Sequence, residues 1–202
     1  MSSKPPRHRL CVYCGSSPGK SPAYLAAAGA LGEAMAAAGI GLVYGGGSIG
    51  LMGEVARAVL KSGGHVTGII PQFLVAKERM LDGVSELIVT RSMHERKHLM
   101  FEHSTGFVAL PGGIGTLEEL AEITTWAQLN QHAKPIIVCD VAGYWGHLLG
   151  LLQHMRAEGF IRAEADVFLD IAKSVGEVIP LYEQRLATAR PKIPLAAIKD
   201  QL

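Results

Sequence analysis

This 202-residue chain has almost no excess charge of either sign, few cysteines and no long apolar run. Its 19 lysine and arginine residues almost balance 18 aspartate and glutamate residues, and a net charge of +1 gives no field that would attract nucleic acid or an anionic membrane. No apolar run approaches the roughly 20 residues of a membrane span. Three cysteines, an odd number, argue against a disulfide framework and for a reducing compartment. We therefore expect a cytoplasmic protein without nucleic-acid or membrane partners.

The remaining composition is that of a domain with a large core. Hydrophobic residues make up 49% of the chain and charged residues only 18%, a balance that suits a buried sheet and indicates that a partner covers some apolar helix surface. Predicted strands at 9–14, 40–44, 66–70, 87–90, 107–110, 135–139 and 167–171 alternate with predicted helices at 22–38, 51–62, 92–103, 117–128, 144–159 and 174–187. This alternation predicts a Rossmann-like, doubly wound parallel sheet with helices on both faces. We expect a single α/β domain over 9–190, a disordered lead-in at 1–8 and a tail at 191–202.

The stretch 106–119, with the sequence GFVALPGGIGTLEE, organises the rest of the chain. Its apolar run reads as a buried parallel strand, which Pro111 ends. A glycine turn follows, and Thr116 occupies the position expected for the N-cap of the next helix. Because unpaired N–H groups and the positive end of the helix dipole meet there, the pattern predicts an anion site with a phosphate as its occupant.

Two other glycine turns follow predicted strands. Residues 45–50, GGGSIG, fit the dinucleotide fingerprint, but the next strand lacks the terminal acid that NAD binding needs. A tight turn is one alternative, and a nucleotide site shared with the 111–116 turn is the favoured one, with Gly46 and Gly47 in it. Residues 15–21, GSSPGKS, imitate a P-loop but are one residue short. Ser16 there is either a ligand contact or part of a solvated turn.

Two short patterns imitate metal and redox sites. His94 and His98 form HExxH, a zinc-protease pattern, yet Glu95 is also explained as the reciprocal cap of a helix that begins at Ser92. We expect surface or interface histidines and no metal. The CxxC at 11–14 lies within a strand, so its two side chains point to opposite faces and are expected to be buried structural thiols.

Two motifs together resemble one family. PGGIGTLEE at 111–119 and the MHxRKxxM pattern at 93–100 are similar to the signatures of the LOG family, the cytokinin riboside 5'-monophosphate phosphoribohydrolases, formerly labelled lysine decarboxylases. The resemblance extends from about residue 9 to 190. It implies a hydrolase that cleaves the N-glycosidic bond of cytokinin nucleotides, with AMP as the common relative, and no metal or organic cofactor. A pyridoxal enzyme needs a Schiff-base lysine, and Lys97 lies beside Arg96 without such a setting.

The resemblance also implies residue roles. It makes Arg96 and Glu119 catalytic, and by family position it makes Glu78, Lys97 and Thr125 substrate contacts. With the phosphate turn, the candidate substrate-binding residues are Ser16, Gly46, Gly47, Glu78, Lys97, Gly112, Gly113, Ile114, Gly115, Thr116, Leu117, Glu118 and Thr125. Two alternatives stay open: Glu119 as a mere cap of Thr116, and Arg96 as a solvated helix charge.

Two further expectations concern partners and function. Apolar residues lie all around the helices at 92–103 and 117–129, among them Met93, Met100, Phe101 and Trp126, and we expect a homodimer, as the resemblance also implies. The competing function is a nucleotide sensor or carrier without turnover. Such a protein needs the phosphate turn but no carboxylate beside the sugar, so the Arg96–Glu119 pair favours the hydrolase.

Overall fold

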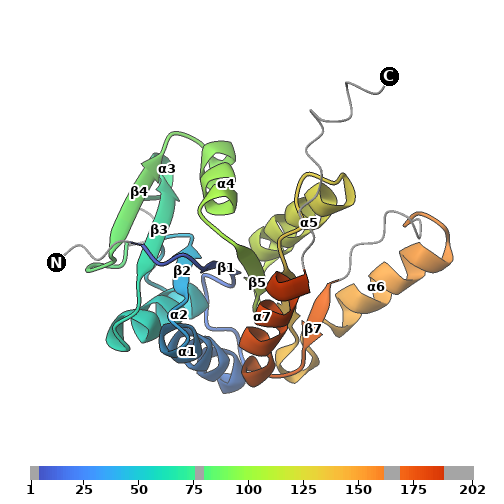
Figure 1. The fold of residues 1–202 in the computed structure, drawn as a ribbon, viewed down its shortest axis with the longest axis horizontal. Helices are drawn as coiled ribbons and strands as arrows, with labels where there is room; N and C mark the ends of the chain where they lie inside the picture. The colour runs from blue at the N-terminus through green and yellow to red at the C-terminus, as the bar shows by residue number, and fades with distance from the viewer. Residues whose placement is uncertain (1–4, 76–79, 162–168, 189–202) are drawn as a thin grey trace.

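The computed structural model describes residues 5–75, 80–161 and 169–188, which form a seven-stranded sheet in the order β4-β3-β2-β1-β5-β6-β7 (Figure 1). Every neighbouring pair of strands is parallel. The strands are β1 Arg9–Tyr13, β2 Gly41–Tyr44, β3 Val66–Pro71, β4 Glu86–Thr90, β5 Gly106–Ala109, β6 Ile136–Cys139 and β7 Asp170–Ala172. The predicted doubly wound parallel sheet is confirmed.

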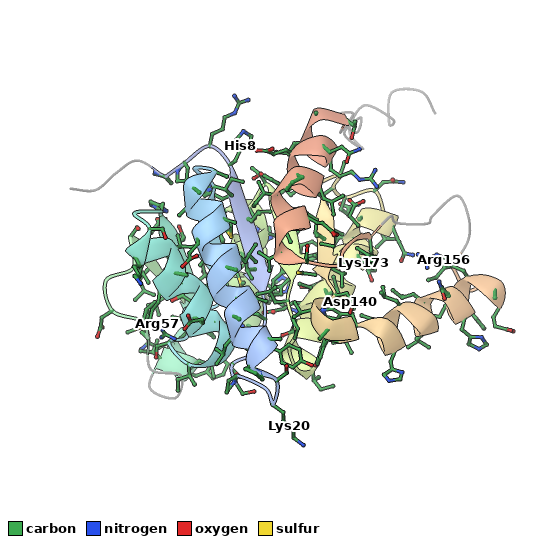
Figure 2. The ribbon with its side chains drawn as sticks, turned by 90° about the horizontal axis from the view of Figure 1, so that it is seen from below. His8, Lys20, Arg57, Asp140, Arg156 and Lys173 are labelled. Carbon is green, nitrogen blue, oxygen red and sulfur yellow. The ribbon has the colours of Figure 1, made fainter. Side chains whose placement is uncertain are left out.

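Helices cover both faces of this sheet. They are α1 Pro22–Ala37, α2 Gly50–Lys61, α3 Gln72–Val75, α4 Met93–Glu102, α5 Ile114–Gln128, α6 Gly146–Ala157 and α7 Val178–Thr188. One face packs against α1, α2 and α7, and Figure 2 shows α1 and α7 side by side over it. The other face packs against α4, α5 and α6. No helix in the described part of the chain is both long and apolar enough to cross a membrane.

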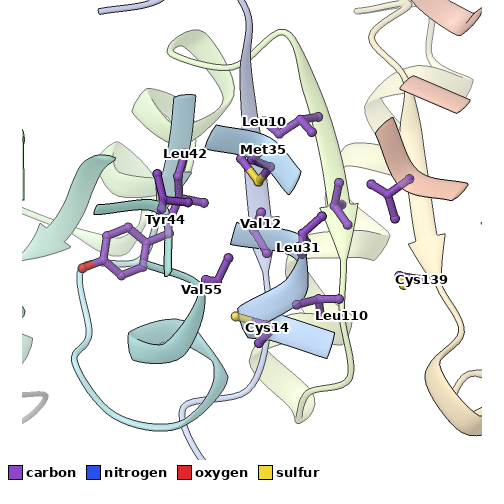
Figure 3. Packing of buried hydrophobic residues seen from close by; sticks show 14 of the residues in the cluster. Leu10, Val12, Cys14, Leu31, Met35, Leu42, Tyr44, Val55, Leu110 and Cys139 are labelled. Carbon is purple, nitrogen blue, oxygen red and sulfur yellow. The ribbon is translucent and has the colours of Figure 1, made fainter. Parts of the chain in front are cut away.

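The two-residue period of β1 divides the core into two layers. Leu10 and Val12 pack under α1, where Figure 3 shows them beside Leu31 and Met35. Cys11 packs on the opposite face, whereas Cys14 lies with the first layer, as the strand period predicts. Both thiols are free and buried, and burial raises the pKa of each far above its usual value. They therefore stay protonated and structural at neutral pH.

The strand order reverses between β1 and β5, and this reversal locates the site. The chain winds from β1 through β2 and β3 to β4 on one side, and from β5 through β6 to β7 on the other. Loops that leave the carboxyl ends of the two central strands therefore part in opposite directions and leave a crevice between them. The Gly15 N–H donates to the Pro111 carbonyl at 3.0 Å and joins the two loops at the base of this crevice.

Several predicted boundaries are wrong. Residues 5–8 of the predicted lead-in are described, and there the His8 carbonyl accepts from the Gly41 N–H at 3.0 Å and the His8 ring lies 6.4 Å from that of Tyr182. The helix predicted from 144 begins at Gly146, after a 3-10 turn at Val141–Gly143. The last strand is Asp170–Ala172 and so ends one residue later than predicted, whereas positions 167 and 168 of the predicted strand lie outside the described residues.

Part of the apolar surface that suggested a dimer is buried within the subunit. Met100 is 1% exposed, and the Phe101 ring stacks on Phe107 at 5.9 Å and meets Trp126 edge-on at 5.1 Å. The Lys134 ammonium lies 3.7 Å above the Phe101 ring. These contacts account for the two aromatic side chains without a partner chain, so the homodimer stays a prediction that rests on fewer residues.

Candidate active site

The helix after the glycine turn begins earlier than predicted. Its N-cap is Gly113, which has no side chain to cap the helix, and the first intrahelical bond runs from the Leu117 N–H to the Gly113 carbonyl at 3.1 Å. Thr116 therefore lies inside the first turn, and its prediction as the N-cap is wrong. Because glycine has no capping side chain, the N–H groups of residues 114–116 in the first turn can bind a ligand at the N-terminus of the helix. The predicted anion site is thus built from backbone more than from side chains.

A pocket of about 250 Å³ lies at this helix N-terminus. The residues that line it come from the ends of β1 and β5 and from α2, α4 and α5: Cys14, Gly15, Ser16, Met52, Arg96, Gly113, Ile114, Gly115, Thr116 and Glu119. Seven of the predicted site residues are in this set, including the two predicted as catalytic. The crevice between the ends of β1 and β5 and the glycine turn before α5 thus line the same pocket.

Arg96 and Glu119 meet inside this pocket. An Arg96 Nη atom lies 3.6 Å from a Glu119 carboxylate oxygen, and the two side chains are only 9% and 11% exposed. The Arg96 Nε–H also donates to the Ile69 carbonyl at 3.2 Å, so β3 holds the guanidinium from a second side. Both simpler interpretations fail: Arg96 is buried instead of solvated, and Glu119 cannot form a capping box with Thr116 because Thr116 is not the N-cap.

Gly45, at the end of β2, is a glycine because Arg96 passes over it. A Cβ atom at this position would lie 2.1 Å from an Arg96 Nη atom, far inside van der Waals contact. At Gly45, the turn therefore leaves room for the Arg96 side chain. Of the two predicted glycines, Gly46 packs on Ile70 and Gly47 pairs with Met80, and neither lines the 250 Å³ pocket.

The other predicted contacts lie on the outer surface of α4 and α5. The Lys97 ammonium bonds Glu118 at 2.6 Å and Glu122 at 3.0 Å. Burial lowers the pKa of Lys97, but these two carboxylates outweigh it and raise the pKa above its usual value. A protonated lysine held this way is a poor Schiff-base nucleophile. Thr125 is exposed and donates to the Ala121 carbonyl at 2.8 Å.

Three further predicted residues do not appear in the lining of the 250 Å³ pocket. Gly112 lines the neighbouring pocket, Leu117 lines neither of the two, and Glu78 lies outside the described residues. The substrate-contact roles of Glu78, Lys97 and Thr125 remain predictions.

The HExxH pattern is used for local structure. Ser92 Oγ accepts from the Glu95 N–H at 3.1 Å, which is the predicted cap. In the reciprocal bond of a capping box, the Glu95 carboxylate would accept from the Ser92 N–H. Here it accepts from the N–H of the preceding residue, Arg91, at 2.7 Å. His98 lies 3.3 Å from Glu102, one turn along α4. Within 5–75, 80–161 and 169–188, no three His, Cys, Asp or Glu side chains are grouped as a metal site would need.

The sequence did not reveal a second pocket, of about 190 Å³, on the other side of the glycine turn. It shares Gly15 and Gly113 with the first pocket, and its wall includes Tyr24 and Tyr144. Tyr144 follows the end of β6, the strand next to β5. Its position after a strand beside the switch point is the one signal that could have pointed to it.

Fold and site together define a Rossmann-like α/β protein with a buried Arg–Glu pair beside a helix N-terminus whose N-cap is a glycine. A family model described as "Possible lysine decarboxylase" matches residues 52–181. The chain is 53% identical over 153 residues to the probable cytokinin riboside 5'-monophosphate phosphoribohydrolase LOGL9 of Oryza sativa subsp. japonica. The aligned residues make up 76% of this chain and 67% of that protein. It is 47% identical to the cytokinin riboside 5'-monophosphate phosphoribohydrolase LOG3 of Arabidopsis thaliana, over 87% of this chain and 82% of that one.

Solved structures agree on the fold. The Moco carrier protein from Chlamydomonas reinhardtii superposes with a TM-score of 0.70 at 24% identity, over 92% of this chain and 100% of that chain. At that identity the likeness concerns the fold alone. The sequence relatives are closer, and the chain belongs to the LOG family of cytokinin riboside 5'-monophosphate phosphoribohydrolases.

Proposed function

We propose that this protein hydrolyses the N-glycosidic bond of nucleoside 5'-monophosphates, with cytokinin nucleotides and AMP as the substrate class. The C1'–N9 bond breaks, the water oxygen bonds C1', and the leaving base takes a proton, so the products are the free base and ribose 5-phosphate. One observation carries this proposal: the buried Arg96–Glu119 pair opens onto the same pocket as the N-terminus of α5.

The helix terminus supplies the phosphate site. The N–H groups of residues 114–116 come before the first intrahelical bond, and the positive end of the helix dipole lies at the same point. Thr116 is part of the pocket wall, and a threonine hydroxyl can donate to a phosphate oxygen. A 5'-phosphate bound there places the ribose toward the interior of the pocket.

Glu119 supplies the carboxylate beside the ribose. It follows Thr116 by three residues, nearly one turn, so the two side chains share one face of α5. Departure of the base builds positive charge on the sugar, as in glycoside hydrolysis, and a carboxylate stabilises that charge and can deprotonate the attacking water. Low exposure of the pair strengthens this interaction, because less solvent screens it.

Arg96 supplies a permanent positive charge at the opposite wall. Its guanidinium stays protonated at any working pH and presents a planar fork of donors. Held by the Ile69 carbonyl, it can bind the phosphate or the departing base while it orients Glu119.

Removal of the 5'-phosphate tests the proposal. Two or more charge-assisted hydrogen bonds at about 1.5–3 kcal/mol each predict that kcat/KM for AMP exceeds that for adenosine by at least about 100-fold. Base release measured by chromatography with both substrates gives the ratio. Equal kcat/KM values would remove the helix terminus from the function.

The oligomeric state is a separate prediction. We infer a homodimer, because Ile114 at the start of α5 and Leu129 just after its end are 81% and 62% exposed. We also infer a reducing cytoplasm, because Cys11, Cys14 and Cys139 are free and buried. Multi-angle light scattering at micromolar concentration is expected to give twice the mass of the chain. The mass of a single chain would contradict the dimer.

A further inference from the structure

The glycine turn of the phosphate site has a tyrosine behind it. The Tyr144 hydroxyl donates a hydrogen bond to the Gly112 carbonyl, and both residues line the 190 Å³ pocket. The carbonyl of the preceding residue, Pro111, accepts a hydrogen bond from the Gly15 N–H at 3.0 Å. Both carbonyls that lead into α5 are therefore held by donors from neighbouring loops.

The segment between β6 and α6 is shaped to present this tyrosine. Ala142 and Gly143 adopt left-handed backbone conformations, with φ of 54° and 72°, which is costly for alanine. The bend in this segment begins at Asp140, which Figure 2 labels. The Asp140 carboxylate accepts from the Trp145 N–H at 2.7 Å, and this bond ties the start of the bend to its end. A local strain of this kind persists only where surrounding contacts maintain it.

Two aromatic neighbours hold the Tyr144 ring. The ring of Trp145, which is 5% exposed, lies 5.0 Å away at 88°, and the ring of Tyr24 from α1 lies 5.6 Å away at 77°. Both are edge-to-face arrangements, which are favourable for aromatic pairs. The Tyr144 ring, which is 38% exposed, thus contacts an aromatic ring on each of two sides while its hydroxyl bonds the Gly112 carbonyl.

The hydrogen bond controls the direction of an N–H group. The Gly112 carbonyl and the Gly113 N–H belong to one planar trans peptide unit, so they point in opposite directions. With the Gly112 carbonyl turned to Tyr144, which lines only the smaller pocket, the Gly113 N–H is directed away from that hydroxyl, and Gly113 also lines the pocket that contains Glu119. Gly112 has no side chain to resist rotation, and a rotated unit would aim a carbonyl at the phosphate instead.

We propose that Tyr144 is a positioning residue for the 5'-phosphate, acting through the Gly112–Gly113 peptide. It touches neither the phosphate nor the sugar, and its role is to keep the cap of α5 in the orientation that donates. The inference rests on the proposed function for the identity of the anion, but its binding test needs no turnover.

Tyr144→Phe removes the hydroxyl and keeps the ring. Loss of one oriented donor is expected to raise KM for AMP by roughly 3- to 10-fold and to weaken ribose 5-phosphate binding, measured by calorimetry, by a similar factor. Hydrolysis of adenosine, which has no phosphate, is expected to stay at the level of the parent. Equal losses with AMP and adenosine would make Tyr144 a merely structural residue and overturn the inference.

Tyr182→Phe is the matched control. It removes a hydroxyl that lies 2.5 Å from Thr105 Oγ1 at the opposite end of the sheet, so it is expected to lower the melting temperature and leave KM unchanged. If Tyr144→Phe melts far below the parent, Tyr24→Leu is tested in its place. That change leaves the Tyr144 hydroxyl intact and removes the Tyr24 ring that packs against the Tyr144 ring. Its ribose 5-phosphate binding is expected to weaken too.

The binding measurement separates two failures. If the parent protein binds ribose 5-phosphate but releases no adenine from AMP, the proposed function fails while the role of Tyr144 is still measured. If the parent hydrolyses AMP and the variants bind ribose 5-phosphate as tightly as the parent, the function stands and the role of Tyr144 is refuted.

Discussion

Glu119→Gln is expected to abolish base release from AMP while the protein still folds and binds phosphate. An amide has nearly the shape of the carboxylate but cannot deprotonate water or stabilise a ribosyl cation, and loss of a general base typically costs about 10²–10⁴ in rate. Ribose 5-phosphate or AMP is expected to bind at least as tightly, because a carboxylate near a phosphate dianion repels it. Adenine release under single-turnover conditions measures the effect.

The structure changes the reason why this variant should fold. Glu119 has no part in capping α5, and Arg96 keeps its bond to the Ile69 carbonyl when the charge is removed. The variant loses the counter-charge of a buried guanidinium, so a clear decrease in melting temperature is expected, but the amide and the bond to Ile69 should still allow the protein to fold. Glu102→Gln, the same chemical change at an exposed residue of α4, is the control and should keep the activity of the parent. A stable Glu119→Gln protein with most of its turnover would require another base.

Gly45→Ala is expected to cost nearly as much, although it adds only a methyl group. The new Cβ would lie 2.1 Å from an Arg96 Nη atom, a separation that real Cβ atoms do not adopt, so the guanidinium must move. Arg96 then loses its position beside Glu119 and the Ile69 carbonyl, and a displacement of about 1 Å in a catalytic group can cost 10²-fold. We expect a loss of about that size in kcat/KM for AMP.

The control for this substitution is Gly150→Ala. Gly150 lies in α6, where a Cβ meets no atom within 4 Å, so alanine should keep full activity and stabilise the helix by roughly 0.5–1 kcal/mol. Gly45 has no left-handed backbone either, so strain alone cannot explain a difference between the two variants. If Gly45→Ala retained the kcat/KM of the parent, the observed position of Arg96 would be unimportant for catalysis.

The sheet was predictable because its signals are local. Apolar runs such as 107–110 alternate with helices, and that alternation fixes a parallel, doubly wound arrangement. The start of α5 was not predictable in this way. Gly113 and Gly115 are weak helix formers and Gly113 carries no capping side chain, so the pattern pointed to Thr116 three residues later.

The site was predictable only in part. Arg96 and Glu119 come from different helices, and no spacing rule places them 3.6 Å apart, so the sequence reached them through a resemblance. The GGGSIG turn shows the opposite problem. Its glycines fit a dinucleotide fingerprint, yet Gly45 is required by the passage of a side chain from α4, a contact between segments that are remote in the sequence. Tyr144 was missed for the same reason.

The central claim is that one pocket both binds a nucleoside 5'-monophosphate and breaks its glycosidic bond. The most direct measurement is to incubate the purified protein with AMP and to quantify all products by chromatography. We predict adenine and ribose 5-phosphate in equal amounts, with no adenosine. AMP that binds but is recovered intact would instead identify a nucleotide carrier or sensor, and adenosine with free phosphate would identify a phosphatase; either result would contradict the account.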